Sequence, residues 1–218
     1  MSKPVIIAID GPGASGKGTL ARRLAAHFGY VYLDTGAMYR AVALQVLLAG
    51  ADPANARAAL AAAQKLDAGA LDDPRLRTDR VGAAASQVAA HGDVRQALMV
   101  FQRSFATNPP GNAPGAVLDG RDIGTVICPD AQVKLFVTAS PEARAHRRYL
   151  ELAARGEAAT EAEVLADLQT RDRRDRERAV APLRPAADAH LLDTTNLAID
   201  DAFAVALAAI SGKIASQG

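Results

Sequence analysis

The chain has 218 residues, 50% of them hydrophobic and 22% charged, which is the composition of a globular protein with a packed core. Its formal net charge of +1 argues against a general nucleic-acid-binding domain, because such a domain is expected to be strongly basic. The single cysteine, Cys128, excludes an intramolecular disulfide and is expected to fill core space. No apolar run reaches the roughly 20 residues that cross a bilayer, and the N-terminal run is too short for a signal peptide, so we expect a soluble cytoplasmic protein.

Five short, nearly continuous apolar runs predict buried parallel strands, at residues 5–9, 31–33, 116–118, 133–137 and 190–192. Long helical patterns separate them, which is typical of a doubly wound α/β sheet with five parallel strands. Four of the runs are followed directly by an acid: Asp10, Asp34, Asp119 and Asp193. Ligands of such sheets bind beyond the carboxyl ends of the strands, so these acids indicate the edge at which the site should lie.

Helical patterns cover residues 16–28, 36–48, 54–66, 79–105, 141–154, 161–178 and 199–214, with a break expected at residues 91–92. Ser140 and Thr160 are predicted helix N-caps, and Glu163 stands three residues after Thr160, as in a capping box. Thr78 and Asp79 are further N-cap candidates.

Residues 11–19 read Gly-Pro-Gly-Ala-Ser-Gly-Lys-Gly-Thr and stand between the first apolar run and a helical pattern. This is the arrangement of a phosphate-binding loop, in which glycines let backbone N–H groups turn inward around a phosphate and the next helix adds its positive N-terminal end. Lys17 brings a full charge to the outer phosphates of a bound nucleotide. The expected ATP-binding residues are Gly11, Pro12, Gly13, Ala14, Ser15, Gly16, Lys17, Gly18 and Thr19.

The hydroxyl of this loop comes one position later than in the general pattern, which places Ser or Thr directly after the lysine. Here Gly18 follows Lys17 and Thr19 carries the hydroxyl, an order found in nucleoside monophosphate kinases and less usual in GTPases and motor ATPases. Mg²⁺ is expected to enter with ATP. Thr19 is a candidate ligand, and the metal would otherwise be held through ATP and water.

Two strand ends carry further candidate residues. Residues 34–40 read Asp-Thr-Gly-Ala-Met-Tyr-Arg, and residues 119–122 read Asp-Gly-Arg-Asp. The hydroxyl of Thr35, the phenol of Tyr39 and the guanidinium of Arg40 suit an anion or substrate site, although a capped helix with an exposed arginine would have the same sequence. Arg121 and Asp122 would flank the cleft, although an ordinary turn is the alternative.

Arginines gather in the second half of the chain. On a helix, Arg171, Arg174, Asp175 and Arg178 share one face, which could clamp phosphates through bidentate hydrogen bonds. The alternative is a solvated helix stabilised by i,i+4 ion pairs. Arg144, Arg147 and Arg148 precede a glycine-containing turn, and two arginine-rich helices joined by such a turn predict a lid that excludes water from a transferring phosphoryl group.

Five motifs, in order, resemble those of the bacterial cytidylate kinases, a family of P-loop kinases. They are I-D-G-P-x-x-S-G-K-G-T at the start, L-D-T-G-A-M-Y-R at 33–40, A-S-Q-V-A-A at 85–90, D-G-R-D-I-G-T-V at 119–126 and R-D-x-R-D-R-x-R-A-V-A-P-L at 171–183. The resemblance implies ATP-dependent phosphorylation of CMP and dCMP by a cytoplasmic monomer that uses Mg²⁺ with ATP and has no nucleic-acid or membrane partner.

The resemblance also implies roles for individual residues. Ser86, Arg95 and Asp122 would read the cytosine, although Ser86 and Arg95 taken alone favour a solvated helix face. The implied CMP-binding residues are Thr35, Tyr39, Arg40, Ser86, Arg95, Arg121, Asp122, Arg171 and Asp175, and the implied catalytic residues are Lys17, Arg121, Arg171 and Arg178.

A single P-loop kinase domain is expected to divide into three regions. The core comprises residues 1–34, 107–146 and 179–218, the helical monophosphate-binding region residues 35–106, and the lid residues 147–178. The three-stranded insert that many family members carry would fall near residues 66–80, where the turn-rich sequence predicts truncation to a loop with at most a hairpin.

Three other functions fit parts of the sequence. A kinase of another small acceptor, such as UMP, AMP or shikimate, would share the phosphate-binding loop and the lid. A GTP-dependent switch would share only the loop, and the guanine-reading motif N-K-x-D is absent from the chain. Nucleic-acid binding would depend on the arginine clusters alone, and the near-zero net charge weighs against it.

Overall fold

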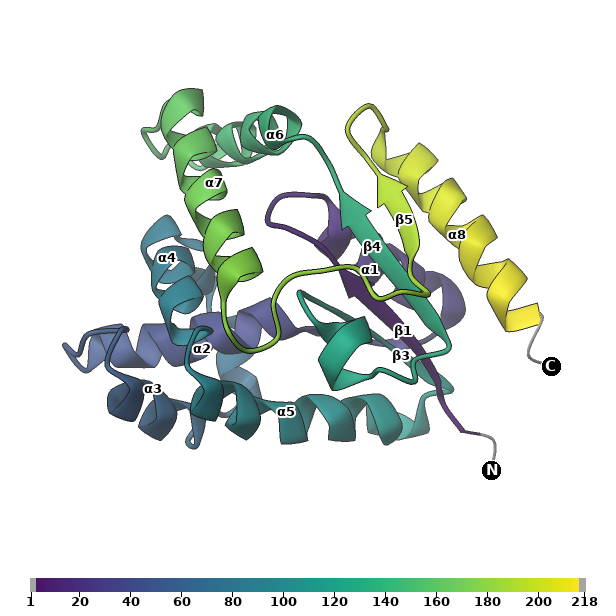
Figure 1. Cartoon of the computed structure of the whole chain (residues 1–218), viewed down its shortest axis with the longest axis horizontal. Coiled ribbons are helices and arrows are strands. Elements are labelled where there is room, and N and C mark those ends of the chain that lie inside the picture. Colours follow the sequence, from purple (N-terminus) through teal and green to yellow (C-terminus); the bar gives the residue numbers. More distant parts are fainter. Residues whose placement is uncertain (1–2, 216–218) are drawn as a thin grey trace.

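The computed structural model describes residues 3–215, which form one five-stranded parallel sheet with helices on both faces (Figure 1). The strands are β1 (Val5–Asp10), β2 (Val31–Asp34), β3 (Gly115–Gly120), β4 (Val133–Thr138) and β5 (His190–Asp193), in the order β2-β3-β1-β4-β5. All five predicted strands are confirmed, each extended by one to three residues. Because β3 and β4 pair with opposite sides of β1, the loop that leaves β1 lies at the centre of the sheet edge.

The eight helices of the described chain are α1 (Lys17–Phe28), α2 (Thr35–Leu48), α3 (Ala56–Ala63), α4 (Asp79–Val88), α5 (Gly92–Thr107), α6 (Pro141–Ala154), α7 (Glu161–Glu177) and α8 (Ile199–Ala215). The predicted break at residues 91–92 separates α4 from α5. Ser140 caps α6, and Thr160 with Glu163 forms the predicted capping box of α7. Thr78 occupies the N-cap position of α4 as predicted, but its hydroxyl makes no capping hydrogen bond and donates to the Arg75 carbonyl oxygen instead.

Two apolar clusters cover the two faces of the sheet. On one face, α1 and α8 pack around Ile7, Leu24 and Ile210, which are at most 1% exposed. On the other face, α2, α4 and α5 pack around Val42, Val88 and other residues of the larger cluster, and the buried Cys128 belongs to it as expected. Among the described residues, no helix has the length and apolar character that crossing a bilayer requires.

The region in which a truncated insert is expected lies between α3 and α4. Residues 66–80 contain no strand, and two short 3-10 turns, Ala68–Asp72 and Pro74–Arg77, connect α3 to α4. The carboxylates of Asp67 and Asp73 accept backbone N–H groups at the starts of these turns. The chain between β2 and β3 therefore contains helices and turns but no strand.

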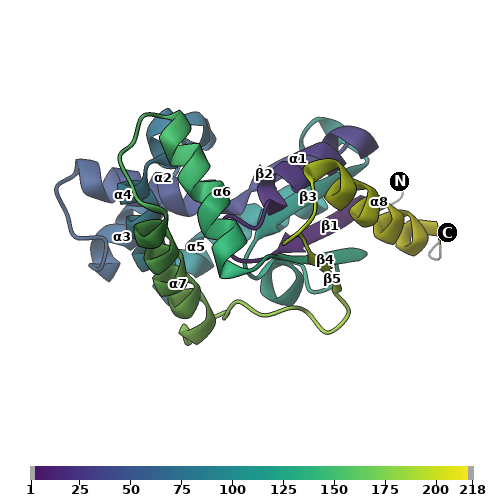
Figure 2. The same ribbon diagram turned by 90° about the horizontal axis from the view of Figure 1, so that it is seen from above.

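The two arginine-rich helices, α6 and α7, pack against each other around Leu152, Val164 and Leu168. Seen from above, they lie over the carboxyl-end edge of the sheet, and α7 runs beside α4 (Figure 2). The expected lid thus bridges the sheet and the helical region between β2 and β3.

Candidate active site

A cavity of about 1100 Å³ opens at the carboxyl ends of β1, β2 and β3. Its walls come from the phosphate-binding loop, the start of α2, the helices α4 and α5, and the lid helices. Of the predicted site residues, those that line it are Gly13, Ala14, Ser15, Gly16, Lys17, Gly18, Thr19, Thr35, Tyr39, Arg40, Ser86, Arg95, Arg121, Asp122, Arg171, Asp175 and Arg178. Segments up to 165 positions apart in sequence therefore meet in one space.

Gly11 and Pro12 are the two predicted residues outside the lining. Gly11 has φ +154°, and a Cβ atom on it would lie 2.0 Å from the carbonyl oxygen of Val137. Only glycine lets the loop leave β1 this close to β4. Its contribution is to set the path of the loop.

The loop is shaped to present backbone donors. Ala14 and Gly16 have positive φ angles, of 57° and 84°, and α1 begins at Lys17 with no side-chain cap on its first N–H groups. Such uncapped N–H groups, together with the positive end of the helix dipole, favour an anion in the cavity. Burial, followed by the Arg121 guanidinium, lowers the pKa of Lys17 to about 8, although nearby carboxylates oppose the shift.

Asp119 explains why glycine stands where the general loop pattern has a hydroxyl residue. A Cβ atom on Gly18 would lie 3.1 Å from Asp119 Oδ2. The Tyr32 hydroxyl donates to the same oxygen at 3.0 Å, and the Thr35 hydroxyl donates to the Asp119 carbonyl oxygen at 2.7 Å. Burial raises the pKa of the Asp119 carboxyl, while Lys17 acts to lower it. The carboxylate is thus fixed directly beside the phosphate-binding helix.

Four cationic side chains, Lys17, Arg40, Arg121 and Arg171, form what we call the cationic cluster. Arg121 is held by Asp175, with Nε 2.9 Å from Oδ2. Among the described residues, no carboxylate lies within 4.0 Å of the Arg40 or Arg171 guanidinium. Burial, then Arg121 and Arg40, lower the pKa of Arg171 to about 10. This much uncompensated positive charge in a recessed cavity favours the binding of a polyanion.

A second group of polar residues lies further along the same cavity. Arg95 and Asp122 form an ion pair, and both side chains are almost fully buried. Arg178 Nη2 lies 3.7 Å from Asp122 Oδ1, and the Arg95 guanidinium stands over the Tyr39 ring, 5.5 Å from its centre. The Ser86 hydroxyl is buried without a hydrogen-bond partner in the described chain. An unused buried hydroxyl beside a paired donor and acceptor suits a polar, planar ligand.

The three arginines of α6 have different surroundings. Of the three arginines predicted from α6, only Arg148 lines the cavity. Arg144 is 2% exposed, pairs with Asp172 on α7 at 2.6 Å and donates to the Gly13 carbonyl oxygen at 3.2 Å, so it joins the lid to the loop. Arg147 instead binds Thr194, with Nη1 3.0 Å from Oγ1.

On α7, the predicted common face is correct for Arg171, Asp175 and Arg178 but wrong for Arg174. Arg174 is exposed and does not line the cavity. Helical spacing alone does not separate them, because position 174 also stands three residues after 171 and four before 178. The difference is in exposure, since Arg174 lies on the solvent side of this face.

The lid also touches the shortened insert, which sequence reasoning missed. Arg148 pairs with Asp79 and with Glu151, and Arg155 donates to the Arg77 carbonyl oxygen at 3.1 Å. All of these residues line the cavity. No local pattern predicts the contacts with Asp79 and Arg77, because these partners lie 69 and 78 positions away in sequence.

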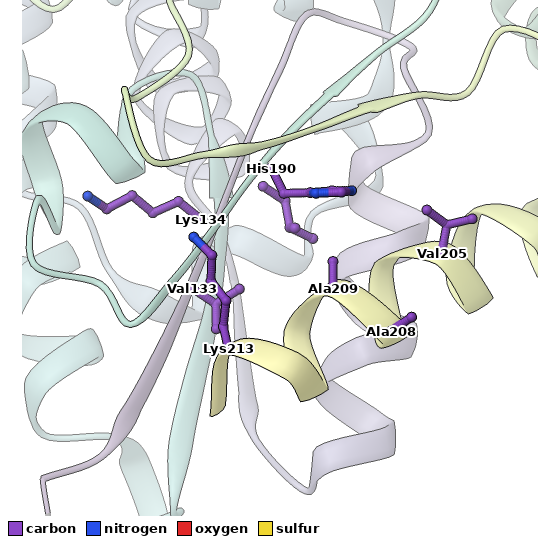
Figure 3. A pocket seen from close by; sticks show the side chains of 8 residues that line it. Val133, Lys134, His190, Val205, Ala208, Ala209 and Lys213 are labelled. Atoms are coloured by element: carbon purple, nitrogen blue, oxygen red, sulfur yellow. The ribbon is translucent and has the colours of Figure 1, made fainter. Parts of the chain in front are cut away.

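A smaller cavity, of about 390 Å³, lies between α8 and the first residues of β4 and β5 (Figure 3). Its lining is mainly apolar, and Lys134 at its rim is paired with Asp188 at 3.0 Å. None of the predicted site residues lines it. The large cavity is therefore the candidate active site.

Comparison with known proteins agrees with this geometry. The family model for cytidylate kinase matches residues 7–211. A cytidylate kinase of Rhodospirillum rubrum is 58% identical over 209 residues, which cover 96% of this chain and 98% of that protein. A cytidylate kinase of Afipia carboxidovorans is 59% identical over 213 residues, which cover 98% of this chain and 100% of that protein.

A solved structure shares the fold. It is an uncharacterized protein from Eubacterium ventriosum, with a TM-score of 0.54 and 16% identity, matched over 95% of this chain and 98% of that chain. The motif resemblance is confirmed at the level of family by the model match and by the two relatives. The chain belongs to the cytidylate kinase family.

Proposed function

We propose that this protein transfers the γ-phosphoryl group of ATP to CMP, and also to dCMP. The observation that carries the proposal is the pairing, in one cavity, of the cationic cluster with the buried polar group of Ser86, Arg95 and Asp122. The cluster suits phosphates, and the polar group suits a base. The names of the related proteins supply the same activity.

The base would be recognised by matched donors and acceptors. Cytosine donates from its N4 amino group and accepts at N3 and O2, so Asp122 and Ser86 accept while Arg95 donates. Uracil reverses the pattern at N3 and O4 and would leave buried groups unpaired, which disfavours it strongly.

The transfer itself needs positioning more than a protein base, because the acceptor phosphate is already an anion. An oxygen of the CMP phosphate bonds to the γ-phosphorus, the bond from that phosphorus to the β,γ-bridging oxygen breaks, and its electron pair leaves with ADP. Arg40 and Arg121 would hold the acceptor phosphate, and Lys17, Arg171 and Arg178 would neutralise charge that develops during transfer.

Mg²⁺ fits this cavity as a partner of the nucleotide. The described residues contain no group of three or more His, Cys, Asp or Glu side chains that could cage a metal, and Mg²⁺ commonly uses substrate phosphates, waters and one or two carboxylates. Asp119, fixed beside Gly18, and the Thr19 hydroxyl would hold it or its waters. Bound there, the ion would neutralise phosphate charge.

Initial rates with CMP, dCMP, UMP and AMP at fixed ATP and Mg²⁺ test the proposal. We expect kcat/KM for CMP and dCMP to exceed the UMP value by about 100-fold or more, the range for sites that hydrogen-bond their substrate specifically. Equal rates with UMP would replace the cytosine assignment with a broader acceptor range. Slow hydrolysis with a strong GTP preference and no CMP effect would favour a nucleotide switch instead.

The protein is further proposed to act as a monomer in the cytoplasm, without a nucleic-acid or membrane partner. A net charge of +1 supports the absence of electrostatic attraction to nucleic acid. The arginines of the cavity are recessed and partly paired, so they do not form an exposed basic face.

Binding of ATP should take up a proton near pH 8. The pKa of Lys17 is about 8 in the free protein, and the phosphates of ATP would raise it by favouring the charged amine. At pH 8 about half a proton should therefore be taken up per ATP bound. Calorimetric titration in two buffers of different ionisation enthalpy measures this number, and identical heats in both buffers would contradict the assignment.

Replacing Asp175 with alanine should raise KM for CMP and dCMP by about tenfold, the effect of losing one hydrogen bond of average strength or slightly more. Asp175 faces the cavity and holds Arg121, so its loss removes a pentose acceptor and releases an acceptor-binding arginine. KM for ATP should change less than twofold. The matched control is Asp167→Ala, since Asp167 lies exposed on the same helix, and unchanged KM for CMP in Asp175→Ala would remove it from the pentose site.

A further inference from the structure

Asp10, the last residue of β1, makes contacts that the reaction as described does not use. Its side chain is buried, with the residue only 4% exposed, and it does not line the cavity. The backbone N–H of Ile123 donates to Oδ1 and that of Gly124 to Oδ2, both at 2.8 Å. One carboxylate thus accepts hydrogen bonds from two consecutive backbone amides that lie more than 110 positions away in sequence.

These two amides open a short π-helical turn, Ile123–Ile127, that directly follows Asp122. Within the turn, the Asp122 carbonyl oxygen accepts from the N–H groups of Val126 and Ile127. The first N–H groups of a helical turn have no partner inside it and need an external acceptor. Asp10 supplies that acceptor from the neighbouring strand.

The turn has little freedom to sit elsewhere. A Cβ atom on Gly124 would lie 3.1 Å from Lys134 Cδ and 3.4 Å from Asp10 Oδ2. Just before the turn, Arg121 and Asp122 face the cavity. The position of Asp10 therefore determines where the acceptor-binding residues stand relative to the phosphate-binding loop, which begins one residue after it.

We infer that Asp10 is a positioning residue. By accepting hydrogen bonds from the amides of Ile123 and Gly124, it fixes the turn that presents Arg121 and Asp122 to the acceptor nucleotide. This inference depends on the proposed function for the identity of the acceptor. The hydrogen bonds of Asp10 are observed in the structure whatever the acceptor is.

The ionisation of Asp10 gives a direct readout. Burial raises its pKa to about 6, with Asp122 adding to the shift and the two amides and Arg121 opposing it. Lys134, against Gly124, and Cys128, at the end of the turn, are the other titratable groups near the contact. Protonation of Asp10 would weaken its hydrogen bonds to the two amides, so the turn should become less ordered as the pH falls through about 6.

The kinetic test uses Asp10→Asn, which keeps the size of the side chain but sets an amide donor against a backbone donor. KM for CMP should rise by about tenfold and the preference for CMP over UMP should fall, while KM for ATP changes less than twofold. The control is Ile210→Ala, which weakens the opposite core cluster and should leave the KM for CMP unchanged. Unchanged KM for CMP in Asp10→Asn would overturn the inference.

A nucleotide-free measurement keeps the test valid if Asp10→Asn does not fold. In the wild-type protein, the amide proton of Gly124 and the Nε–H signal of Arg121 should shift together with pH, with one midpoint near 6. A fixed Gly124 signal, or an Arg121 signal that does not follow it, would refute the positioning role. Absence of CMP phosphorylation by the wild-type protein would refute the proposed function and leave this titration interpretable.

Discussion

Replacing Lys17 with methionine is expected to lower kcat for CMP phosphorylation by about 1000-fold, the upper end of the range for removing one preorganised electrostatic contact. Of the described residues, Lys17 is the only lysine that lines the cavity, and it stands at the first turn of α1, beside the uncapped N–H groups. Arginines of the cationic cluster remain in the variant, but none of them occupies the phosphate-binding loop. Single-turnover and steady-state rates measure the loss.

The folded state should survive this substitution. In the folded protein the pKa of Lys17 is about 8, below its usual value of 10.5, so keeping the amine charged at pH 7 opposes folding by about 3 kcal/mol. This penalty is complete below pH 8 and disappears as the pH rises toward 10.5. Methionine removes it, so thermal unfolding of the free variant should occur at or above the wild-type temperature.

Lys134→Met provides a matched control, because it is the same change at a lysine outside the active-site cavity. Lys134 lines the smaller cavity (Figure 3). It pairs with the exposed Asp188. Its kcat should remain within twofold of wild type. Full activity in Lys17→Met, or an equal loss in Lys134→Met, would contradict the placement of Lys17 at the transferring phosphate.

The sheet and the phosphate-binding loop could be predicted because their signals are local. A buried parallel strand needs a short apolar run, and the loop needs glycines and a lysine within nine positions, so all of the information lies within one segment. The absence of strands from residues 66–80 was predictable for the same reason, since this segment lacks any apolar run that could pair as a strand. These features do not depend on what packs against them.

The roles of individual arginines were less predictable. An arginine that binds a ligand and an arginine that makes a structural contact can stand in the same local sequence. Arg144 and Arg148 are one helical turn apart on α6, yet Arg144 is buried against Asp172 and Arg148 faces the cavity. Only the packing of α6 against the loop and α7 separates them. The hydrogen bonds from the Ile123 and Gly124 amides to Asp10 could not be predicted for a related reason. The acceptor and the donors lie in segments that only the fold brings together.

The second large effect is expected in the selection of CMP over UMP. Asp122→Asn should lower kcat/KM for CMP by about 10- to 100-fold, the range for losing a hydrogen bond to a charged acceptor, and should leave UMP turnover equal or faster. The Asp122 side chain is 7% exposed and pairs with Arg95, and asparagine can retain a contact to Arg95 through its carbonyl oxygen. Its amide group would then point a donor toward the position of the cytosine N4 amino group, where uracil instead has an acceptor.

Asparagine is preferable to alanine in this experiment, because Asp122→Ala would leave the buried Arg95 without its paired carboxylate and would confound recognition with instability. Asp188→Asn is the matched control, since Asp188 is an exposed acid that pairs with Lys134 away from the active-site cavity, and its CMP-to-UMP ratio should equal that of wild type. KM for ATP should stay within twofold in both variants. Equal losses for CMP and UMP in Asp122→Asn would assign Asp122 to holding Arg95 and Arg178 in place, whereas a loss confined to CMP requires that the carboxylate itself meets the base.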